Sequence, residues 1–319
     1  MPARTIGLFQ WRRDWADLWL CQCEGPWGRE PGPNGEIEFR PFDRDADHLL
    51  LIGPPVDPAG NPPMPYLARK RAKLAERHDA ERLRHATAAL GRAKSDMTML
   101  VYEPACAFSD AWFETAAELF DRVYAPDDRA THPIVLPSTW SFTDRLQALR
   151  DEPPTDDRPL ALSCVTSGKR LWPGHDVRLD FLRSVRAAGI PMDLFGKGLP
   201  ADLAPRGPVE SKATVYRASR MALVIENDAA GDRYVTEKLW DALICWCLPL
   251  YHGSRAPDAI IPPEAFIRVP SLDQAGIDAI REALADEPRR AARLDAIREA
   301  RSRALGELRL AAWAARTLA

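Results

Sequence analysis

The sequence lacks the long apolar run that a membrane-spanning helix needs. No uncharged apolar stretch in its 319 residues approaches the roughly 20 residues required to cross a bilayer. The N-terminal segment MPARTIGLFQWRRDWADLW is interrupted by charges and has no signal-peptide core. We therefore expect no integral membrane segment and a cytoplasmic protein, with peripheral attachment to an inner membrane left open.

The sequence also has few residues arranged as metal ligands. Two Cys-x-Cys pairs are too tightly spaced for an ordinary zinc site, and no paired histidines accompany them. Asp45-Ala46-Asp47 has the spacing of some carboxylate metal sites, but it precedes a strand instead of ending one. We expect no metal site, and we expect buried free thiols, which are typical of a reducing compartment. The cysteines are Cys21, Cys23, Cys106, Cys164, Cys245 and Cys247.

The sequence has a small net charge and shows no internal repeat. The net charge of -3 argues against a nucleic-acid-binding protein. No internal repeat of a repeat-protein period and no sustained heptad pattern is evident. Basic residues do gather in a predicted long helix over 66–95. Its acidic residues favour an ordinary solvated face, and a basic face for an anionic acceptor or a membrane surface is the alternative.

The pattern of apolar runs predicts an α/β protein with parallel sheets, because strands alternate with helices in both halves. The length exceeds that of one typical core, so we expect two domains. A Pro- and Asp-rich stretch at 151–157 is the best boundary. This gives a domain over 1–150, a second over 151–271, and helices over 272–319 that the sequence permits to pack back on the first domain. Strands are predicted at 4–9, 17–23, 48–53, 97–102, 159–165, 192–197 and 221–225.

The most informative stretch is MALVIENDAAGDRYVTEKLWDALICWCLPLYHG, residues 221–253. Residues 221–225 form an almost wholly apolar run, which is typical of a strand buried on both faces. Glu226 and Asn227 follow it, at the carboxyl end of a strand, where ligands bind in open α/β sheets. A helix is predicted to begin near Thr236, and residues 248–251 look like the next strand.

The first turn of that helix combines a cation with an acid. Tyr234, Glu237 and Lys238 have i, i+3, i+4 spacing, so we expect them on one helix face. A helix N-terminus attracts anions, and Lys238 makes this end suitable for a phosphate. Glu237 could accept hydrogen bonds from sugar hydroxyls. The alternative is an ordinary first-turn acid beside a solvated lysine.

The pattern E-N-x6-Y-V-T-E-K-L-W-D-A-L-x4-L-P-L-Y-x-G closely resembles the donor-binding motif of the α-1,3/4-fucosyltransferase family, glycosyltransferase family 10, of bacterial type. The similarity continues through residues 261–267. It implies the GT-B architecture, in which two Rossmann-like domains face each other across a cleft. The first domain would bind an oligosaccharide or glycoconjugate acceptor and the second GDP-fucose, with no cofactor required.

The resemblance also implies roles for individual residues. VRLDFL, residues 177–182, resembles the family segment whose arginine binds the pyrophosphate, so this role falls to Arg178, in the first turn of a helix predicted over 176–188. Glu103, which ends the strand at 97–102 and precedes Pro104, aligns with the proposed general base. The donor-binding residues would be Arg178, Glu226, Asn227, Tyr234, Glu237 and Lys238.

These roles describe an inverting fucosyltransferase. The arginine and lysine would stabilise the leaving GDP, while Glu103 removes the proton of the acceptor hydroxyl. Two alternatives stay open. A GT-B enzyme could use another nucleotide sugar, because the motif contains nothing that recognises guanine unambiguously, and a non-catalytic protein could bind the nucleotide sugar without transfer. The sequence does not identify the acceptor.

Overall fold

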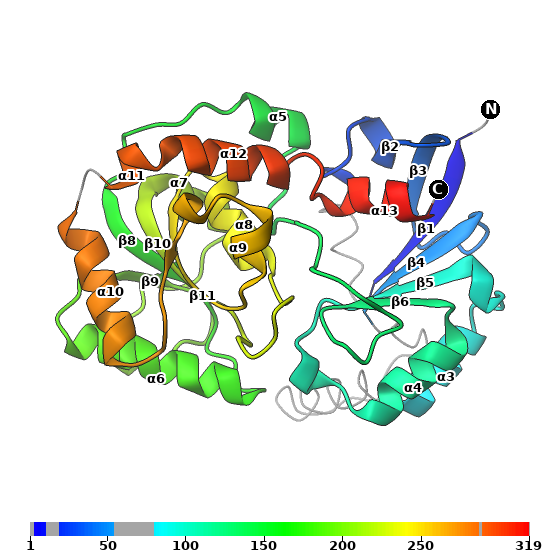
Figure 1. The fold of residues 1–319 in the computed structure, drawn as a ribbon, viewed down its shortest axis with the longest axis horizontal. Helices are drawn as coiled ribbons and strands as arrows, with labels where there is room; N and C mark the ends of the chain where they lie inside the picture. The colour runs from blue at the N-terminus through cyan, green and yellow to red at the C-terminus, as the bar shows by residue number, and fades with distance from the viewer. Residues whose placement is uncertain (1–2, 11–18, 54–79, 287–288, 319) are drawn as a thin grey trace. The chain divides into compact units, whose positions relative to one another are not determined.

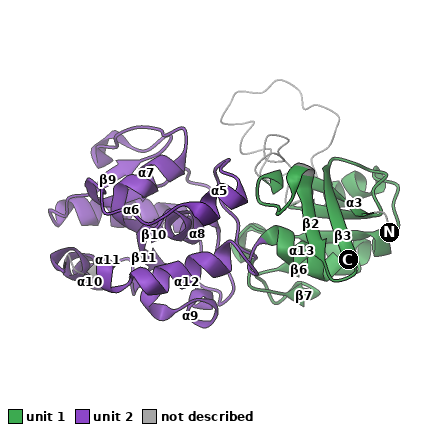
Figure 2. Ribbon diagram, turned by 90° about the horizontal axis from the view of Figure 1, so that it is seen from above, with its two compact units in different colours: residues 1–136, 310–319 green, residues 137–309 purple. Residues whose placement is uncertain are grey.

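The computed structural model describes residues 3–10, 19–53, 80–286 and 289–318. The chain forms two compact units. Unit 1 comprises residues 1–136 and 310–319, and unit 2 comprises residues 137–309 (Figure 2). Each unit is an α/β structure built on its own sheet, which confirms the predicted fold class.

The sheet of unit 1 has the strand order β2-β3-β1-β4-β5-β6-β7. All neighbouring strands are parallel except β2 and β3. Every residue of β4 and β5 is buried, as expected for central strands covered on both faces. The strands are β1 (Arg4–Gln10), β2 (Arg29–Gly32), β3 (Gly35–Pro41), β4 (His48–Ile52), β5 (Met97–Leu100), β6 (Arg122–Ala125) and β7 (His132–Pro133).

Helices lie on both sides of this sheet (Figure 1). The C-terminal helix α13 (Leu310–Leu318) packs near β2, and Arg122 Nη1 donates to Thr317 O at 3.1 Å. On the other side α3 (Ala80–Ala88) packs against α4 (Asp110–Leu119), which Ser109 caps by accepting from Trp112 N. Short 3-10 turns occur at η2 (Pro26–Gly28), η3 (Lys94–Asp96) and η4 (Ala105–Ala107).

The sheet of unit 2 is wholly parallel, with the strand order β12-β11-β10-β8-β9. The chain adds β9 on one side of β8 and then returns to place β10 on the other side. The topological switch point therefore lies between β8 and β10, where open α/β sheets bind their ligands. The strands are β8 (Leu160–Val165), β9 (Asp193–Phe195), β10 (Ser219–Ile225), β11 (Leu248–His252) and β12 (Ile267–Arg268).

Helices cover both faces of this second sheet, with α6 and α10 on one side and α7, α8 and α12 on the other (Figure 1). The helices are α5 (Leu146–Asp151), α6 (Pro173–Ala187), α7 (Lys212–Ala218), α8 (Glu237–Ile244), α9 (Ala256–Ile260), α10 (Gln274–Ala285), α11 (Arg289–Ala292) and α12 (Leu294–Ala304). The 3-10 turns are η5 (Ala201–Leu203) and η6 (Pro263–Ala265). Within the described ranges, no helix is both long and apolar enough to cross a membrane.

The boundary between the units lies at residues 136 and 137, whereas the sequence placed it at 150. The segment between these positions is bonded to unit 2, because Ser141 binds Asp241 and Arg150 Nη2 donates to Leu305 O at 3.0 Å. The terminal helices divide, since α10 to α12 belong to unit 2 and α13 to unit 1.

Three local predictions need comment. The strand expected at 17–23 is wrong in its described part, where Gln22 N and Cys23 N donate to Trp19 O and Leu20 O in turns. Of the helix expected over 66–95, residues 66–79 lie outside the described residues, and α3 forms within the remainder. The helix expected over 176–188 begins earlier, at Pro173, because the fixed φ and missing N–H of proline suit a first turn.

Candidate active site

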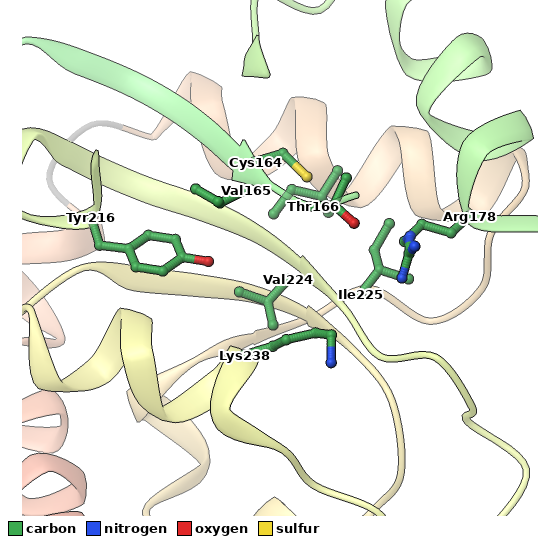
Figure 3. A pocket seen from close by; sticks show the side chains of 9 residues that line it. Cys164, Val165, Thr166, Arg178, Tyr216, Val224, Ile225 and Lys238 are labelled. Atoms are coloured by element: carbon green, nitrogen blue, oxygen red, sulfur yellow. The ribbon is translucent and has the colours of Figure 1, made fainter. Parts of the chain in front are cut away.

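A small pocket opens at the switch point of unit 2. The ends of β8 and β10 form its walls, through residues 164–166 and 223–225. Arg178 from α6 and Lys238 from α8 both line it, together with Tyr216 from α7 (Figure 3). The structure therefore brings to one pocket two cations that lie 60 positions apart in the sequence (238 minus 178).

Lys238, in the first turn of α8, is held by the buried carboxylate of Glu226, which follows β10. Its Nζ lies 3.3 Å from Glu226 Oε2 and donates to Thr236 Oγ1 at 2.9 Å. Glu226 also accepts from Thr236 N at 2.8 Å and Thr236 Oγ1 at 2.7 Å. Thr236 in turn caps the helix by accepting from Lys238 N. The ammonium group is thus fixed beside the helix N-terminus, where the backbone already favours an anion.

Glu226 was predicted to contact the donor, but its side chain has no exposed area. Both of its oxygens are bonded, to Thr236 and Lys238. A carboxylate enclosed in this way cannot reach a ligand directly, so its geometry is that of a support for Lys238 and for the cap of α8. The sequence cannot distinguish these roles, because either one places an acid at the end of β10.

Arg178 faces the interior of unit 2 and is only 2% exposed. Its Nη1 donates to Asn227 Oδ1 at 2.6 Å and its Nη2 to Ser167 O at 3.2 Å. Its Nε is buried without a partner among the described residues. Burial lowers the pKa of this guanidinium from its usual value, but arginine stays protonated in proteins. Two of its five N–H groups are used by these bonds, which leaves three for an anion in the pocket.

The position of Arg178 in its helix differs from the prediction. Since α6 begins at Pro173, Arg178 is its sixth residue and belongs to the second turn instead of the first. Val177 is 50% exposed, while Arg178 lies on the buried face with Leu179, Phe181 and Leu182. A hydrophobicity pattern selects Val177 for the core because it does not count a buried arginine.

The N-terminus of α6 is fitted closely against the end of β10. A Cβ on Gly174 would lie 2.1 Å from Asn227 O, so only glycine permits this approach. His175 caps the helix by accepting from Leu171 N at 3.0 Å and Trp172 N at 3.2 Å. Burial, together with the nearby charges of Arg178, Lys169 and Lys238, lowers the pKa of His175 to about 4, so this ring is neutral at physiological pH. Sequence analysis missed His175, although Pro173 two residues earlier is a signal for a helix start.

Tyr234 and Glu237 lie at the start of α8, but they do not share a helix face. Tyr234 precedes the cap residue Thr236 and therefore lies outside the helix. It is 4% exposed, whereas the Glu237 side chain is 31% exposed. The prediction of a common face is wrong because the helix begins at Glu237, three residues after Tyr234.

Glu103 belongs to unit 1 and follows β5 by three residues, at the carboxyl end of that sheet, where it is half-buried. Arg129 secures the turn after it by donating to Ala105 O at 2.9 Å and Phe108 O at 3.1 Å. Arg129 is itself paired with Asp127 at 2.7 Å. Sequence analysis missed this clamp, because both partners lie in a loop more than twenty residues later.

The described residues contain no group of three or more His, Cys, Asp or Glu side chains placed to hold a metal. All six cysteines are free thiols. Cys23, Cys164, Cys245 and Cys247 are buried as predicted, whereas Cys106 is exposed. Burial raises the pKa of Cys164, which lies beneath the pocket, to about 12, so this thiol is protonated.

The family of unit 2 follows from a comparison of its sequence with protein-family models. Residues 164–282 match the model for glycosyltransferase family 10 (fucosyltransferase), C-terminal part. These residues form a glycosyltransferase family 10 domain. The match confirms the predicted family and the prediction of a glycosyltransferase. The family 10 domain contains every predicted donor-binding residue, whereas Glu103 lies outside it.

Solved structures with the same fold include glycosyltransferases of different specificity. An α1,3-fucosyltransferase in complex with GDP has 15% identity, a TM-score of 0.50, and coverage of 92% of this chain and 81% of its own. An α-glucosyltransferase in complex with UDP-glucose and DNA has 12% identity, a TM-score of 0.54, and coverage of 97% and 96%. At such identities the likeness establishes the fold alone, and it confirms the predicted GT-B class. No curated protein matches the chain by sequence.

Proposed function

We propose that the chain is an inverting fucosyltransferase, which moves L-fucose from GDP-β-L-fucose to a hydroxyl of a glycan acceptor in an α-1,3/4-type linkage. The observation that carries the proposal is the pocket in the family 10 domain, which Arg178 and Lys238 line together. The fucosyltransferase family supports L-fucose as the transferred sugar. The solved α1,3-fucosyltransferase that binds GDP has the same fold and supports the nucleotide.

The reaction breaks the bond between the anomeric carbon and the β-phosphate oxygen through an oxocarbenium-like transition state. Negative charge grows on the leaving GDP. Arg178 and Lys238 stabilise it, with Lys238 acting together with the N-terminus of α8. Glu226 holds Lys238 in place, and Asn227 holds Arg178. Tyr234 lies next to this group and contacts the nucleotide, while Glu237 binds the sugar.

On the acceptor side, the attacking hydroxyl oxygen forms the new bond to the anomeric carbon and transfers its proton to Glu103. Attack opposite the leaving group inverts the anomeric configuration. A general base of this kind contributes a factor of roughly 10² to 10⁴ in rate. The Arg129 clamp on the following turn keeps the Glu103 backbone in position.

The two cations supply the charge stabilisation that a divalent metal provides in other glycosyltransferases. We therefore expect turnover to be unchanged by EDTA. A strict requirement for added Mg²⁺ or Mn²⁺ would contradict this role of Arg178 and Lys238.

Two experiments test the proposal against its alternatives. Thermal shift with GDP, UDP and ADP identifies the base, and stabilisation by UDP in preference to GDP would favour a different nucleotide sugar. Labelled GDP-L-fucose with an array of glycan acceptors tests transfer and identifies the acceptor. Binding of GDP-fucose with neither hydrolysis nor transfer would indicate a non-catalytic binding protein.

The free cysteines support a reducing compartment, so we propose that the reaction takes place in the cytoplasm. The peripheral association with an inner membrane that residues 66–95 suggested depends largely on residues outside the described ranges. Vesicle flotation with anionic lipid tests that association directly.

A further inference from the structure

A lysine on α7 joins two carboxylates of α8. Lys212 is the first residue of α7, and its Nζ lies 3.1 Å from Glu237 Oε1 and 3.1 Å from Asp241 Oδ2. Asp241 has no exposed side-chain area, and it also accepts from Ser141 N at 2.9 Å and Ser141 Oγ at 2.6 Å. Glu237 is the outer member of this group, with a 31% exposed side chain.

The two carboxylates are close enough to repel each other, and Lys212 compensates this repulsion. Glu237 and Asp241 are four residues apart on one helix, so like charges meet on one face and repel. In the described part of the chain, Glu237 forms one other ion pair, with Lys238 at 3.7 Å, but that ammonium group is bonded to Glu226. These ion pairs form a cluster of three carboxylates (Glu226, Glu237 and Asp241) and two ammonium groups (Lys212 and Lys238). Without Lys212, one ammonium group would face three carboxylates.

The charge states agree with this arrangement. Burial opposes ionisation of Glu237, but Lys238 and Lys212 outweigh it and hold its pKa well below the usual range. Burial would lower the pKa of Lys212, and the two carboxylates instead raise it above its usual value. Burial raises the pKa of Asp241, and Lys212 offsets part of this increase. Tyr216 also faces the cluster, and burial keeps its hydroxyl protonated by raising its pKa.

We propose that Lys212 is a positioning residue for the transferred sugar: its ammonium group orients the Glu237 carboxylate at the pocket end of α8 and balances its charge. The inference rests on the proposed function, in which Glu237 binds fucose. Asp241 and Ser141 anchor the lysine from behind, so the outer carboxylate is fixed at one place although it is partly exposed. Lys212 touches no ligand and acts only through Glu237.

The two parts of the donor separate this role from a general structural one. GDP lacks the sugar, so its affinity should not depend on Lys212, whereas the affinity for GDP-L-fucose should. We expect Lys212→Met to bind GDP like the wild type and to lose roughly 10- to 100-fold in kcat/KM for GDP-L-fucose, as for a lost charge-assisted hydrogen bond. Lys212→Arg, which keeps the charge, is the matched control and should retain most activity.

The pH profile provides a second measurement. In Lys212→Met the repulsion between Glu237 and Asp241 is no longer compensated, so the acid limb of kcat/KM should move upward by about one pH unit or more. In Lys212→Met/Asp241→Asn the repulsion is removed, and the limb should return toward its wild-type position. A limb that stays unmoved in Lys212→Met would overturn the proposal, and so would equal losses of GDP and GDP-L-fucose affinity.

Folding and function can be separated in the same series. If Lys212→Met does not fold, Asp241→Asn and Lys212→Met/Asp241→Asn form the test pair, because neither buries two uncompensated acids. The double variant should bind GDP equally and GDP-L-fucose about 10-fold more weakly than the single variant, and equal binding of GDP-L-fucose would refute the role. Absence of fucose transfer by the wild type would refute the proposed function instead, independently of every Lys212 variant.

Discussion

Replacement of Glu226 by glutamine tests whether this residue supports the site or contacts the donor. The carboxylate is enclosed and accepts from Thr236 N, Thr236 Oγ1 and Lys238 Nζ at 2.8, 2.7 and 3.3 Å. Glutamine has nearly the same shape, but it offers one acceptor oxygen and no charge. At most two of the three donors can keep their bonds, because Thr236 Oγ1 and Lys238 Nζ share one oxygen and Thr236 N uses the other. In either orientation of the amide, Lys238 loses its counter-ion.

The expected cost follows from those losses. Removal of one partner from a buried ion pair destabilises by about 3–5 kcal/mol. The Lys238 side chain keeps 17% exposure, so the lower end applies and we expect about 3 kcal/mol. For a unit of this size that corresponds to a fall of roughly 6–12 °C in the melting temperature of unit 2. Because the cap of α8 is loosened as well, GDP should bind roughly 10-fold more weakly, a change of about 1.4 kcal/mol.

Differential scanning calorimetry and isothermal titration with GDP measure the two effects. Glu264→Gln, at an exposed glutamate of the same unit, is the matched control and should change stability by less than about 0.5 kcal/mol. A Glu226→Gln protein with wild-type stability and no affinity for GDP-fucose would refute our reasoning. Such a result would instead support the direct contact between Glu226 and the donor that the sequence predicted.

Three further changes test other parts of the site. Gly174→Ala places a Cβ 2.1 Å from Asn227 O, so calorimetry should show a net loss of about 1–3 kcal/mol despite the better helix propensity of alanine; a stabilised variant would disprove the close approach. Glu103→Gln should keep its affinity for GDP-fucose and lose roughly 10² to 10⁴ in turnover, and lost nucleotide binding would exclude its role as the base. His175 is neutral in the fold, with a pKa of about 4, while the unfolded chain takes up a proton below about 6.5. Unit 2 should therefore lose up to roughly 3 kcal/mol as the pH falls from 6.5 to 4, and denaturant unfolding of His175→Gln should lack this part of the decrease.

The strands that the sequence predicted best are those whose side chains are buried on both faces. The apolar runs of β4, β5 and β10 are unambiguous because a central parallel strand tolerates few polar residues. The helix starts were less accurate. Pro173 and Thr236 are both signals for a helix start. The periodic pattern nevertheless placed the start of α6 three residues too late, and it wrongly included Tyr234 in α8.

The chemistry of the site was predictable as residue types but not as contacts. An acid at the end of a strand can bind a ligand or a neighbouring side chain, and only the fold shows that Glu226 does the second. Lys212 carried no sequence signal, because its carboxylate partners lie 25 and 29 positions later and meet it only when α7 and α8 pack together. Long-range pairing of this kind is set by tertiary structure and leaves no periodic pattern.

These pairings bear on how the pocket can hold a diphosphate. Within the protein each pocket cation already has an oxygen partner, Glu226 for Lys238 and Asn227 for Arg178. Their side chains are therefore fixed before a ligand arrives, and little conformational entropy remains to be lost on binding. Arg178 is bonded directly only to a neutral amide and a carbonyl, and Glu226 acts on it from a distance, whereas Glu226 is in direct ion-pair contact with Lys238. We infer that Arg178 provides the greater part of the electrostatic attraction for the pyrophosphate, and that Lys238 provides mainly a directed donor beside the N-terminus of α8.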